Sequence, residues 1–432
     1  MEFELLKKSH VKRNILIGVT TIAVLTAGIL TFTKAKYRVT ESIPLVNGTI
    51  NYKPYDFKMI AMYQENDSGE YEEIEVMPSS GYIINEEKSY CTVDGENKDT
   101  SVILKTIDGN HTFSGLQKGS KCYLYFDEYT GPIRDTLLAN YLTRLTRNDF
   151  STIVTDTTTR TIYYADTSKG RTYYFAGNPT DNWVKFGGFY WRIIRINEDG
   201  TIRLIYQGTS ANTTGSNTQI SISVYNNRDY GGVENAHVGY MYTINQPHGL
   251  GSNSIIKELL DQWYISNLLE VADKIDGNAG FCGDRTPYSG SGIGLDYTLY
   301  GAYNRLVTNK SPTFECDNRY DLYTTKGSIT GNGALTYPIG LISADEVSYA
   351  GGVYNVNNTS SYLNTGQGYW TMSAHDYPYY NGQPTVFYMA GGQIADARVN
   401  NENGIRPVIN LKADVQISQG SGTSTDPYVI AT

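Results

Sequence analysis

The segment 183–208, WVKFGGFYWRIIRINEDGTIRLIYQG, is the clearest sign of antiparallel sheet in this chain. Two runs rich in β-branched and aromatic residues lie on either side of the pair Asp199 and Gly200. Such runs are typical of strands, and Asp-Gly is a favoured pair at the tip of a two-stranded hairpin. The segment therefore predicts a β-hairpin, and we expect the domain that contains it to begin near Thr172.

Two helices and three more strands are predicted after this hairpin. Residues 254–275 repeat apolar side chains three and four positions apart, behind a serine that can cap a helix. In SADEVSYAGG (343–352), Ser343 and Glu346 form a capping box that starts a shorter helix. The later strands are YWTMSA, TVFYMAGGQI and GIRPVINLKA. Residues 172–432 are therefore expected to form a mixed α+β head domain.

The region before the head is expected to contain a stalk and a connector. Residues 36–130 alternate short β-type runs with polar turns, which predicts a small antiparallel β-sandwich. The run FSGLQKGSKCYLYFDEY in this region resembles the late strands of immunoglobulin-like and fibronectin-type modules. Residues 131–171 predict a helical connector with one apolar face, followed by a linker or an edge hairpin.

An uncharged segment near the N-terminus predicts a membrane anchor. Residues 15–32, ILIGVTTIAVLTAGILTF, would form a helix of roughly 27 Å, close to the thickness of a bilayer core. Lysines and an arginine precede it, which favours a cytoplasmic N-terminus. We therefore expect a cytoplasmic tail (1–14), a transmembrane signal-anchor (15–35) and an extracellular remainder at the cell surface. A cleaved secretory signal is the alternative, and it would export the same residues.

The composition favours an outward-facing binding or structural protein over a cytosolic enzyme. Charged residues make up only 18% of the chain, and the 38 tyrosines and many small polar residues supply polar surface instead. Antibody combining loops use the same residue types. A net charge of −9 argues against nucleic acid as a partner, because phosphate binding needs a basic patch.

Four cysteines follow the predicted anchor, and four cysteines allow three pairings. Pairing Cys91 with Cys122 and Cys282 with Cys316 is the most economical choice, because each pair then falls within one region. Free thiols are the alternative. No cysteine or histidine spacing suggests zinc, and we expect neither a metal nor a cofactor.

The sequence offers no recognisable catalytic pattern. None of the five histidines lies in a GxSxG or HExxH frame. Asp284 is expected to pair with Arg285, while Asp345 and Glu346 are expected to cap their helix. The Gly-rich segment YSGSGIGLDY has no strand–helix frame around it that would bind phosphate. We therefore expect no catalytic residues.

The candidate ligand-binding segment is YWTMSAHDYPYYNGQP (369–384). Trp370 and Met372 alternate with polar residues and are expected to face the core. The loop that follows is rich in Pro, Gly and Asn, and at least two of its tyrosines are expected to be exposed, ready to stack on sugar rings or to form a protein hot spot. The candidate residues are His375, Asp376, Tyr377, Tyr379 and Tyr380. The alternative is a loop that packs its own rings beneath itself.

Several segments carry a family resemblance. YPIGLISADEVSYAGG, YWTMSA and NENGIRPVINL are similar to segments of C-type-lectin-like domains of the formylglycine-generating-enzyme type. Together with WRIIRI and FCGDR, they also resemble an uncharacterised set of membrane-anchored surface proteins of Firmicutes-type bacteria. The likeness covers about residues 172–415.

The resemblance implies an antiparallel sheet whose first and last strands pair, two helices, and an irregular loop face that binds the ligand. Residues 191–192 and 404–406 would lie on the paired strands. Large side chains expected in the structural core are Trp191, Trp263, Trp370 and Arg406.

Two departures from the family limit what it implies. Gln383 and Pro384 are followed by Thr385, so a carboxylate of the calcium-binding lectin motif is missing. Cys282 and Cys316 precede the segment 343–352, whereas formylglycine synthesis needs a cysteine pair close to the C-terminal strands. We therefore expect neither calcium-dependent sugar binding nor formylglycine synthesis.

The sequence as a whole predicts a single-pass surface protein that binds an extracellular glycan or protein without catalysis, in adhesion or recognition. Two alternatives remain open. One is a structural component of the cell envelope that has no ligand, and the other is a cell-surface hydrolase.

Overall fold

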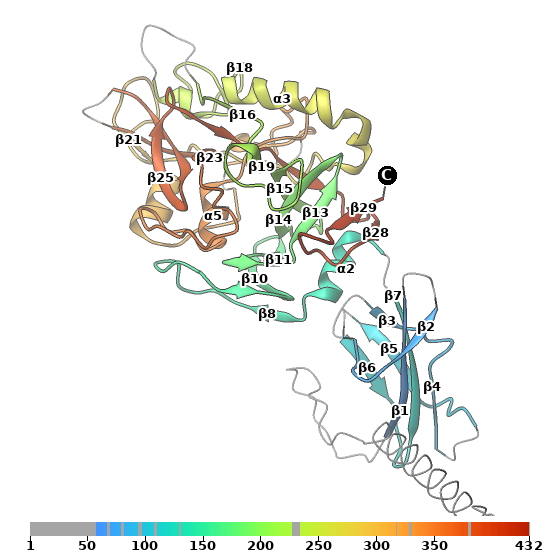
Figure 1. The fold of residues 1–432 in the computed structure, drawn as a ribbon. Helices are drawn as coiled ribbons and strands as arrows, with labels where there is room; N and C mark the ends of the chain where they lie inside the picture. Colours follow the sequence, from blue (N-terminus) through green and yellow to red (C-terminus); the bar gives the residue numbers. More distant parts are fainter. Residues whose placement is uncertain are drawn as a thin grey trace, which may run out of the picture. The chain divides into compact units, whose positions relative to one another are not determined.

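The computed structural model describes residues 58–431 apart from short gaps at 67–69, 79–81, 94–96, 108–109, 129–130, 227–233, 317, 328–330 and 379–381 (Figure 1). The expected cytoplasmic tail and transmembrane segment lie outside these residues. Within the described ranges, no helix is long and apolar enough to cross a membrane. This part of the chain is mainly β-sheet, in several sheets joined by short helices.

The region expected to be a sandwich contains two sheets. The five-stranded sheet comprises β1 (Lys58–Glu65), β2 (Tyr71–Ile74), β3 (Tyr82–Ile84), β4 (Tyr90–Thr92) and β7 (Lys121–Glu128). The second sheet is the hairpin of β5 (Ile103–Ile107) and β6 (Asn110–Ser114). A wholly antiparallel arrangement was expected, but β1 runs parallel to β7.

Strand β7 shows why this region folds around its own core. Cys122, Leu124 and Phe126 alternate with polar or half-buried residues and are fully buried. They pack with buried side chains from β1, β3, β4 and β5, and this cluster draws only on residues 62–126. On the other face, Tyr125 stacks on Tyr63, with ring centroids 4.8 Å apart.

The predicted hairpin forms the centre of a nine-stranded sheet. Its strands are β8 (Thr143–Leu145), β10 (Thr161–Thr167), β11 (Gly170–Tyr174), β13 (Trp183–Phe186), β14 (Phe189–Ile196), β15 (Ile202–Gly208), β27 (Val408–Leu411), β28 (Ile417–Gln419) and β29 (Tyr428–Ile430). β14 and β15 pair antiparallel, and Gly200 at the turn adopts a φ of +86°. The hairpin prediction from 183–208 is confirmed.

A seven-stranded sheet forms the other large layer of the head. Its strands are β16 (Ser221–Val224), β20 (Pro287–Ser289), β21 (Thr298–Tyr300), β23 (Tyr369–Tyr377), β24 (Thr385–Ala390), β25 (Gln393–Arg398) and β26 (Glu402–Ile405). Three two-stranded ladders complete the described strands: β9 (Thr157–Thr158) with β12 (Asn178–Pro179), β17 (Met241–Tyr242) with β18 (Ser252–Asn253), and β19 (Phe281–Cys282) with β22 (Leu322–Tyr323).

The resemblance implied that the closing segment pairs with the first strand of the hairpin. In the structure it does not. β26 pairs with β16 and β23, and β27 pairs with β15, the second strand of the hairpin. Arg406, between them, is fully buried and donates from Nε and Nη2 to the carbonyl of Tyr206, at 3.0 and 2.9 Å.

The helices are short. They are α2 (Ile133–Asn140), α3 (Ile255–Asn267), α4 (Gly301–Tyr303) and α5 (Ala344–Tyr349). The Ser343 cap of α5 and its reciprocal contact from Glu346 are both present, and Ser254 caps α3. The helix expected over 254–275 ends earlier, because Leu268 leaves helical geometry and a 3-10 turn (Leu269–Lys274) follows.

The main hydrophobic core of the head contains residues from Ile133 to Ile430, and a small separate cluster is formed by Tyr163, Tyr174 and Ala176. Trp191 and Trp370 are fully buried in the main core, whereas Trp263 only packs against its margin. Ile133, Leu137 and Tyr141 of the expected connector also belong to this core. The hairpin β10–β11 joins the nine-stranded sheet through β14, so the core of the head begins near Ile133 rather than at Thr172.

Candidate functional site

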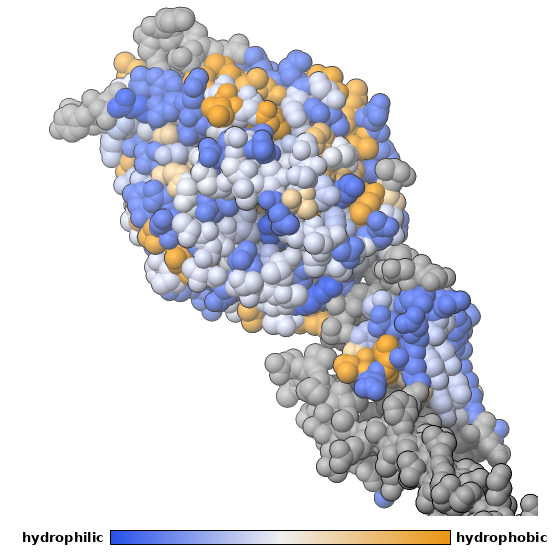
Figure 2. Space-filling model, viewed as in Figure 1, coloured by the Kyte–Doolittle hydropathy of each residue, from blue (hydrophilic) through white to orange (hydrophobic). Residues whose placement is uncertain are grey.

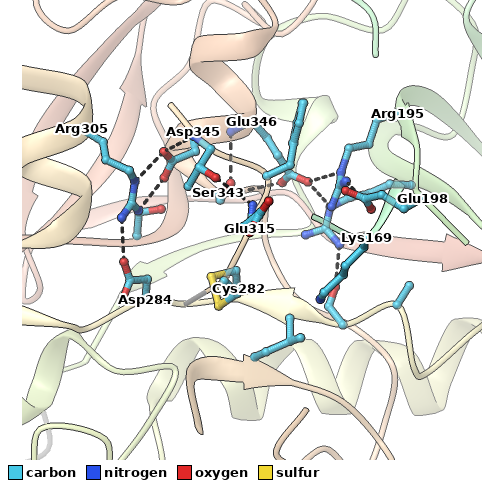
Figure 3. A pocket seen from close by; sticks show the side chains of 18 residues that line it. Lys169, Arg195, Glu198, Cys282, Asp284, Arg305, Glu315, Ser343, Asp345 and Glu346 are labelled. Atoms are coloured by element: carbon cyan, nitrogen blue, oxygen red, sulfur yellow. Dashed lines mark hydrogen bonds and ion pairs between the residues drawn. A yellow bond between two sulfur atoms is a disulfide. The ribbon is translucent and has the colours of Figure 1, made fainter. Parts of the chain in front are cut away.

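A small pocket is lined mainly by charged and polar side chains from β14, β15, the start of α5 and the loops 279–284 and 313–316 (Figure 3). Its cavity measures about 50 Å³. A cavity needs roughly 10–15 Å³ to hold one water, so this one has room for a few waters or for a ligand of few atoms.

On one side of the pocket, Arg305 holds two carboxylates. Its Nε and Nη2 donate to the two carboxylate oxygens of Asp345 at 2.9 and 3.0 Å, and its Nη1 donates to Asp284 at 2.8 Å. Burial alone opposes the charge of Arg305, but the two carboxylates outweigh it and raise the pKa of this guanidinium above its ordinary value. The expected pairing of Asp284 with Arg285 is therefore wrong, because Asp284 pairs with Arg305.

On the other side, Glu346 lies between two arginines. Its Oε1 is 3.2 Å from Arg195 Nε and 2.6 Å from Arg203 Nε, and its Oε2 accepts the backbone N–H of Ser343 at 3.0 Å. Burial lowers the pKa of Arg203 to about 10, and the adjacent Glu346 acts in the opposite direction. The helix cap and the ion pairs thus share one buried carboxylate.

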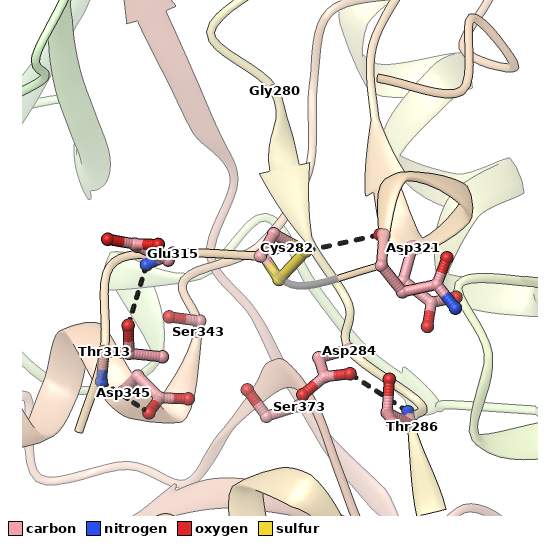
Figure 4. The surroundings of a disulfide bond; sticks show 12 residues. Gly280, Cys282, Asp284, Thr286, Thr313, Glu315, Asp321, Ser343, Asp345 and Ser373 are labelled. Carbon is pink, nitrogen blue, oxygen red and sulfur yellow. Dashed lines mark hydrogen bonds between the residues drawn. A yellow bond between two sulfur atoms is a disulfide. The ribbon is translucent and has the colours of Figure 1, made fainter. Parts of the chain in front are cut away.

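A disulfide between Cys282 and Cys316 forms part of the pocket wall (Figure 4). It ties the end of β19 to the loop 313–316, and the same loop donates the Thr313 N–H to Asp345 at 3.1 Å. Cys91 and Cys122 are also joined, between β4 and β7. Both predicted pairings are confirmed.

The groups of this pocket are occupied in holding its walls together. Ser373 Oγ accepts the N–H of Ala344 at 2.9 Å, and Ser343 Oγ accepts that of Glu346 at 3.1 Å. The carboxylates on the two sides accept from arginines, whereas a general base needs a carboxylate free to take a proton. In the described part of the chain, no group of three or more His, Cys, Asp or Glu could hold a metal ion.

Of the candidate ligand-binding residues, those that the structure describes lie mostly in the interior. Tyr377 is only 3% exposed and His375 only 4%, because β23 extends to Tyr377 and pairs with β21 there. Tyr377 is therefore not one of the exposed tyrosines expected in this loop, and the prediction that at least two of the three are exposed stays a prediction. Asp376 is half-buried, and Tyr379 and Tyr380 lie outside the described residues.

His375 and Asp376 lie close together, the first buried and the second half-buried. His375 Nδ1 is 3.1 Å from Asp376 Oδ1 and 3.0 Å from Thr385 Oγ1. The rings of Tyr354 and Phe387 pack against the imidazole, with centroids at 5.6 and 4.6 Å. This cluster is part of the packing between β23, β24 and the loop before β23.

Exposed apolar side chains lie instead on strand β20, on the loop between β20 and β21 and on the neighbouring turn 243–251. We call this surface the apolar loop face, and its residues are Ile244, Tyr288, Ile293, Leu295 and Tyr297, which are between 39% and 68% exposed. Figure 2 shows that the visible surface of the head is mostly hydrophilic or near neutral, with scattered hydrophobic patches. The signal in the sequence is the pair Ile293 and Leu295 within the Gly-rich run YSGSGIGLDY. From the sequence, this run was considered only as a possible phosphate-binding loop.

Hydrogen bonds fix the shape of this loop. The buried amide of Asn235 donates to the carbonyls of Gly294 and Asp296 at 3.1 and 2.7 Å, and its oxygen accepts from Tyr300 OH at 2.8 Å. Gly290, with a φ of +82°, permits the turn, since an added Cβ would lie 2.0 Å from the carbonyl oxygen of Tyr297. The loop therefore presents its apolar side chains from a rigid backbone.

The turn 243–251 lies directly beside this loop. A Cβ added at Gly292 would be 3.5 Å from Pro247, and one added at Gly294 would be 3.9 Å from Asn245 Oδ1. Asn245 also donates its backbone N–H to Glu234 at 3.1 Å, next to the Asn235 that holds the other loop. The two segments thus form one continuous surface.

Comparisons with known protein families, with curated proteins and with solved structures found no match to this chain.

Proposed function

We propose that this chain is a membrane-anchored surface protein whose lectin-like head binds an extracellular glycan or protein without catalysis, and that the ligand binds at the apolar loop face. The observation that carries the proposal is the exposure of Leu295 (68%), on a loop that hydrogen bonds hold in place, and of Tyr288 (57%), on the adjoining strand β20. Large apolar residues gathered on a soluble surface are typical of interaction sites. A rigid loop also lowers the entropy cost of binding.

The small pocket favours binding over chemistry. Asp284, Asp345 and Glu346 pair with arginines, and Glu315 accepts hydrogen bonds from Ser168, so these carboxylates hold the pocket walls in place. A purely structural envelope component remains the second candidate, and it would have no use for the apolar loop face. A cell-surface hydrolase is the weakest candidate, since it would need a free acid or base in a cleft.

The test is binding of the full chain, in detergent micelles, to arrays of glycans and of extracellular proteins that include the chain itself. We expect a bound ligand whose signal is lost when Leu295 and Tyr288 are both replaced by Ser. The matched control is Leu269→Ser, a leucine that is 54% exposed after α3. Absence of any bound glycan or protein would overturn the proposal in favour of the structural role.

A further inference from the structure

The segments that carry the apolar loop face are almost without charge. Residues 239–256 and 286–304 contain no lysine or arginine, and Asp296 is their only carboxylate. That carboxylate accepts the backbone N–H of Ser291 at 2.9 Å within its own loop. The centres of protein interfaces are depleted of charge in the same way and enriched in tyrosine. The five side chains of the face therefore carry no charge, and the Glu234 carboxylate beside them accepts the backbone N–H of Asn245 at 3.1 Å.

The charge of the whole chain makes this face the favourable place for two copies to meet. A net charge of −9 opposes the approach of a second copy over the rest of the surface. On the apolar loop face this repulsion is small, and a second copy offers the same apolar side chains in return. Contacts between identical patches are the usual way in which two identical chains associate.

The aliphatic side chains favour a protein over a sugar at this face. Leu295 is 68% exposed, Ile293 39% and Ile244 42%. Aliphatic side chains gain free energy by leaving water for another apolar surface, at about 25 cal/mol per Å². A glycan presents mainly hydroxyl groups, which would lose hydrogen bonds to water against these residues. Apolar side chains of a second copy have no such loss.

The size of the face predicts a weak contact. Large side chains expose roughly 150–250 Å² when free, so the exposed fractions of the five residues amount to on the order of 500 Å² per copy. Two copies would then bury on the order of 1,000 Å² together, which is below the size of a standard stable interface. We therefore expect weak and readily reversible association. Anchoring in one membrane would raise the effective concentration of the chain and make so weak a contact effective.

We propose that the apolar loop face binds the same face of a second copy of this chain, in a two-fold symmetric and weakly associating pair. The inference rests on the proposed function, because it names the partner of the same surface. The rigid backbone of the loop, held by Asn235, allows the pair to form without ordering a flexible segment.

The test is sedimentation velocity of the full chain in detergent micelles over a range of concentrations up to about 200 µM. We expect a reversible dimer whose dissociation constant rises at least about tenfold in Leu295→Ser and in Tyr288→Ser. Leu269→Ser is the control of equal chemistry and similar exposure. It lies beyond the 13-residue helix α3, which is about 20 Å long, and should leave the dimer unchanged.

Salt gives a second, independent readout. An apolar contact between two acidic chains should hold or strengthen as salt screens their repulsion, whereas a contact based on ion pairs should weaken. A wild-type chain that stays monomeric, a Leu295→Ser variant that pairs like the wild type, or an equal loss in Leu269→Ser would each overturn the inference. If the arrays show a different ligand that is lost with Leu295 and Tyr288, the proposed function stands and only the self-association fails.

Discussion

Arg305 shows how much of the head depends on single buried charges. It is the ionic partner of Asp284 and Asp345, whose side chains are 6% and 5% exposed. Replacement by Gln would leave both carboxylates in a poorly solvated pocket without a counter-charge. Breaking a buried ion pair in this way typically costs about 3–5 kcal/mol of folding free energy. We therefore expect Arg305→Gln to lower the stability of the head by that amount, measured by urea unfolding.

Arg171 provides the matched control at the same scale. It pairs with Asp166 at 2.8 Å, but the two side chains are 47% and 66% exposed. An exposed pair contributes about 0–1 kcal/mol, so Arg171→Gln should change the unfolding midpoint little. Equal effects of the two substitutions would contradict the structural role that we assign to the pocket.

At the scale of single elements, strand β6 carries a pH-sensitive residue. His111 is largely buried, its Nε2 lies 3.1 Å from the carbonyl of Pro78, and its ring packs against Phe126 with centroids 4.9 Å apart. Burial lowers the pKa of this imidazole below its ordinary value, with the Pro78 carbonyl acting in the opposite direction. The neutral form is therefore favoured in the folded sandwich.

The sign of the pH effect follows from this direction. The unfolded chain takes up the proton near pH 6.5, whereas the folded chain takes it up only at a lower pH. Stability that is present above about pH 6.5 is therefore lost as the pH falls through the folded-state pKa. Hydrogen exchange of the β6 and β7 peptides should accelerate between about pH 7 and pH 5, after correction for intrinsic rates. In His111→Gln this additional pH dependence should disappear; its persistence would assign the effect to other groups.

Helix α2 and the hairpin β10–β11 make a second test at this scale. Ile133 and Leu137 are fully buried in the core of the head, and β11 pairs with β14. A fragment that begins at residue 172 would expose the apolar surface that these elements cover. We expect the fragment 131–432 to show a cooperative thermal transition and the fragment 172–432 to aggregate or to lack one. Cooperative folding of both fragments would mean that α2 is only a connector.

At the scale of the whole molecule, the separate main cores of the two described regions, 62–126 and 133–430, predict two separate unfolding events. The buried cluster of the sandwich draws only on residues 62–126, and that of the head on residues 133–430. All four tryptophans lie in the head, so tryptophan fluorescence reports the head alone. Hydrogen exchange of peptides from strands β1 to β7 reports the sandwich.

The two disulfides allow each core to be weakened by itself. They bridge residues 31 and 34 positions apart, and loops of this length correspond to about 3–4 kcal/mol in the chain-entropy treatment. Replacing Cys282 and Cys316 by Ser should shift the fluorescence transition and leave exchange in the sandwich unchanged. Replacing Cys91 and Cys122 should do the opposite. A shift of both readouts by either variant would show that the two cores unfold together.

Local features were predictable from the sequence. The turn at Asp199 and Gly200, the capping box of Ser343 and Glu346, and the burial of Trp370 each depend on residues a few positions apart. The cysteine pairing was predictable for a related reason, because each pair lies within one folded region. In these cases the preference of a short segment agrees with the whole fold.

The candidate site was not predictable, because contacts between distant segments decide it. Tyr377 lies in a stretch with the composition of an exposed loop, yet its pairing with Thr298 buries it. Arg285 does not pair with its neighbour Asp284, because its Nη2 lies 2.8 Å from Asp321 Oδ1 and pairs with that carboxylate. Leu295 is exposed only because its loop is held outward through Asn235, 60 positions away.

The sequence by itself determined the elements of this protein: where strands turn, where helices begin, and which cysteines join. Only the tertiary structure decided which tyrosines are buried, which carboxylate each arginine holds, and which loop presents apolar side chains to water. The physical reason is the separation in sequence between the residues that interact. Turns and caps depend on hydrogen bonds between near neighbours, whereas burial and ion pairing depend on side chains that meet only after the chain has folded.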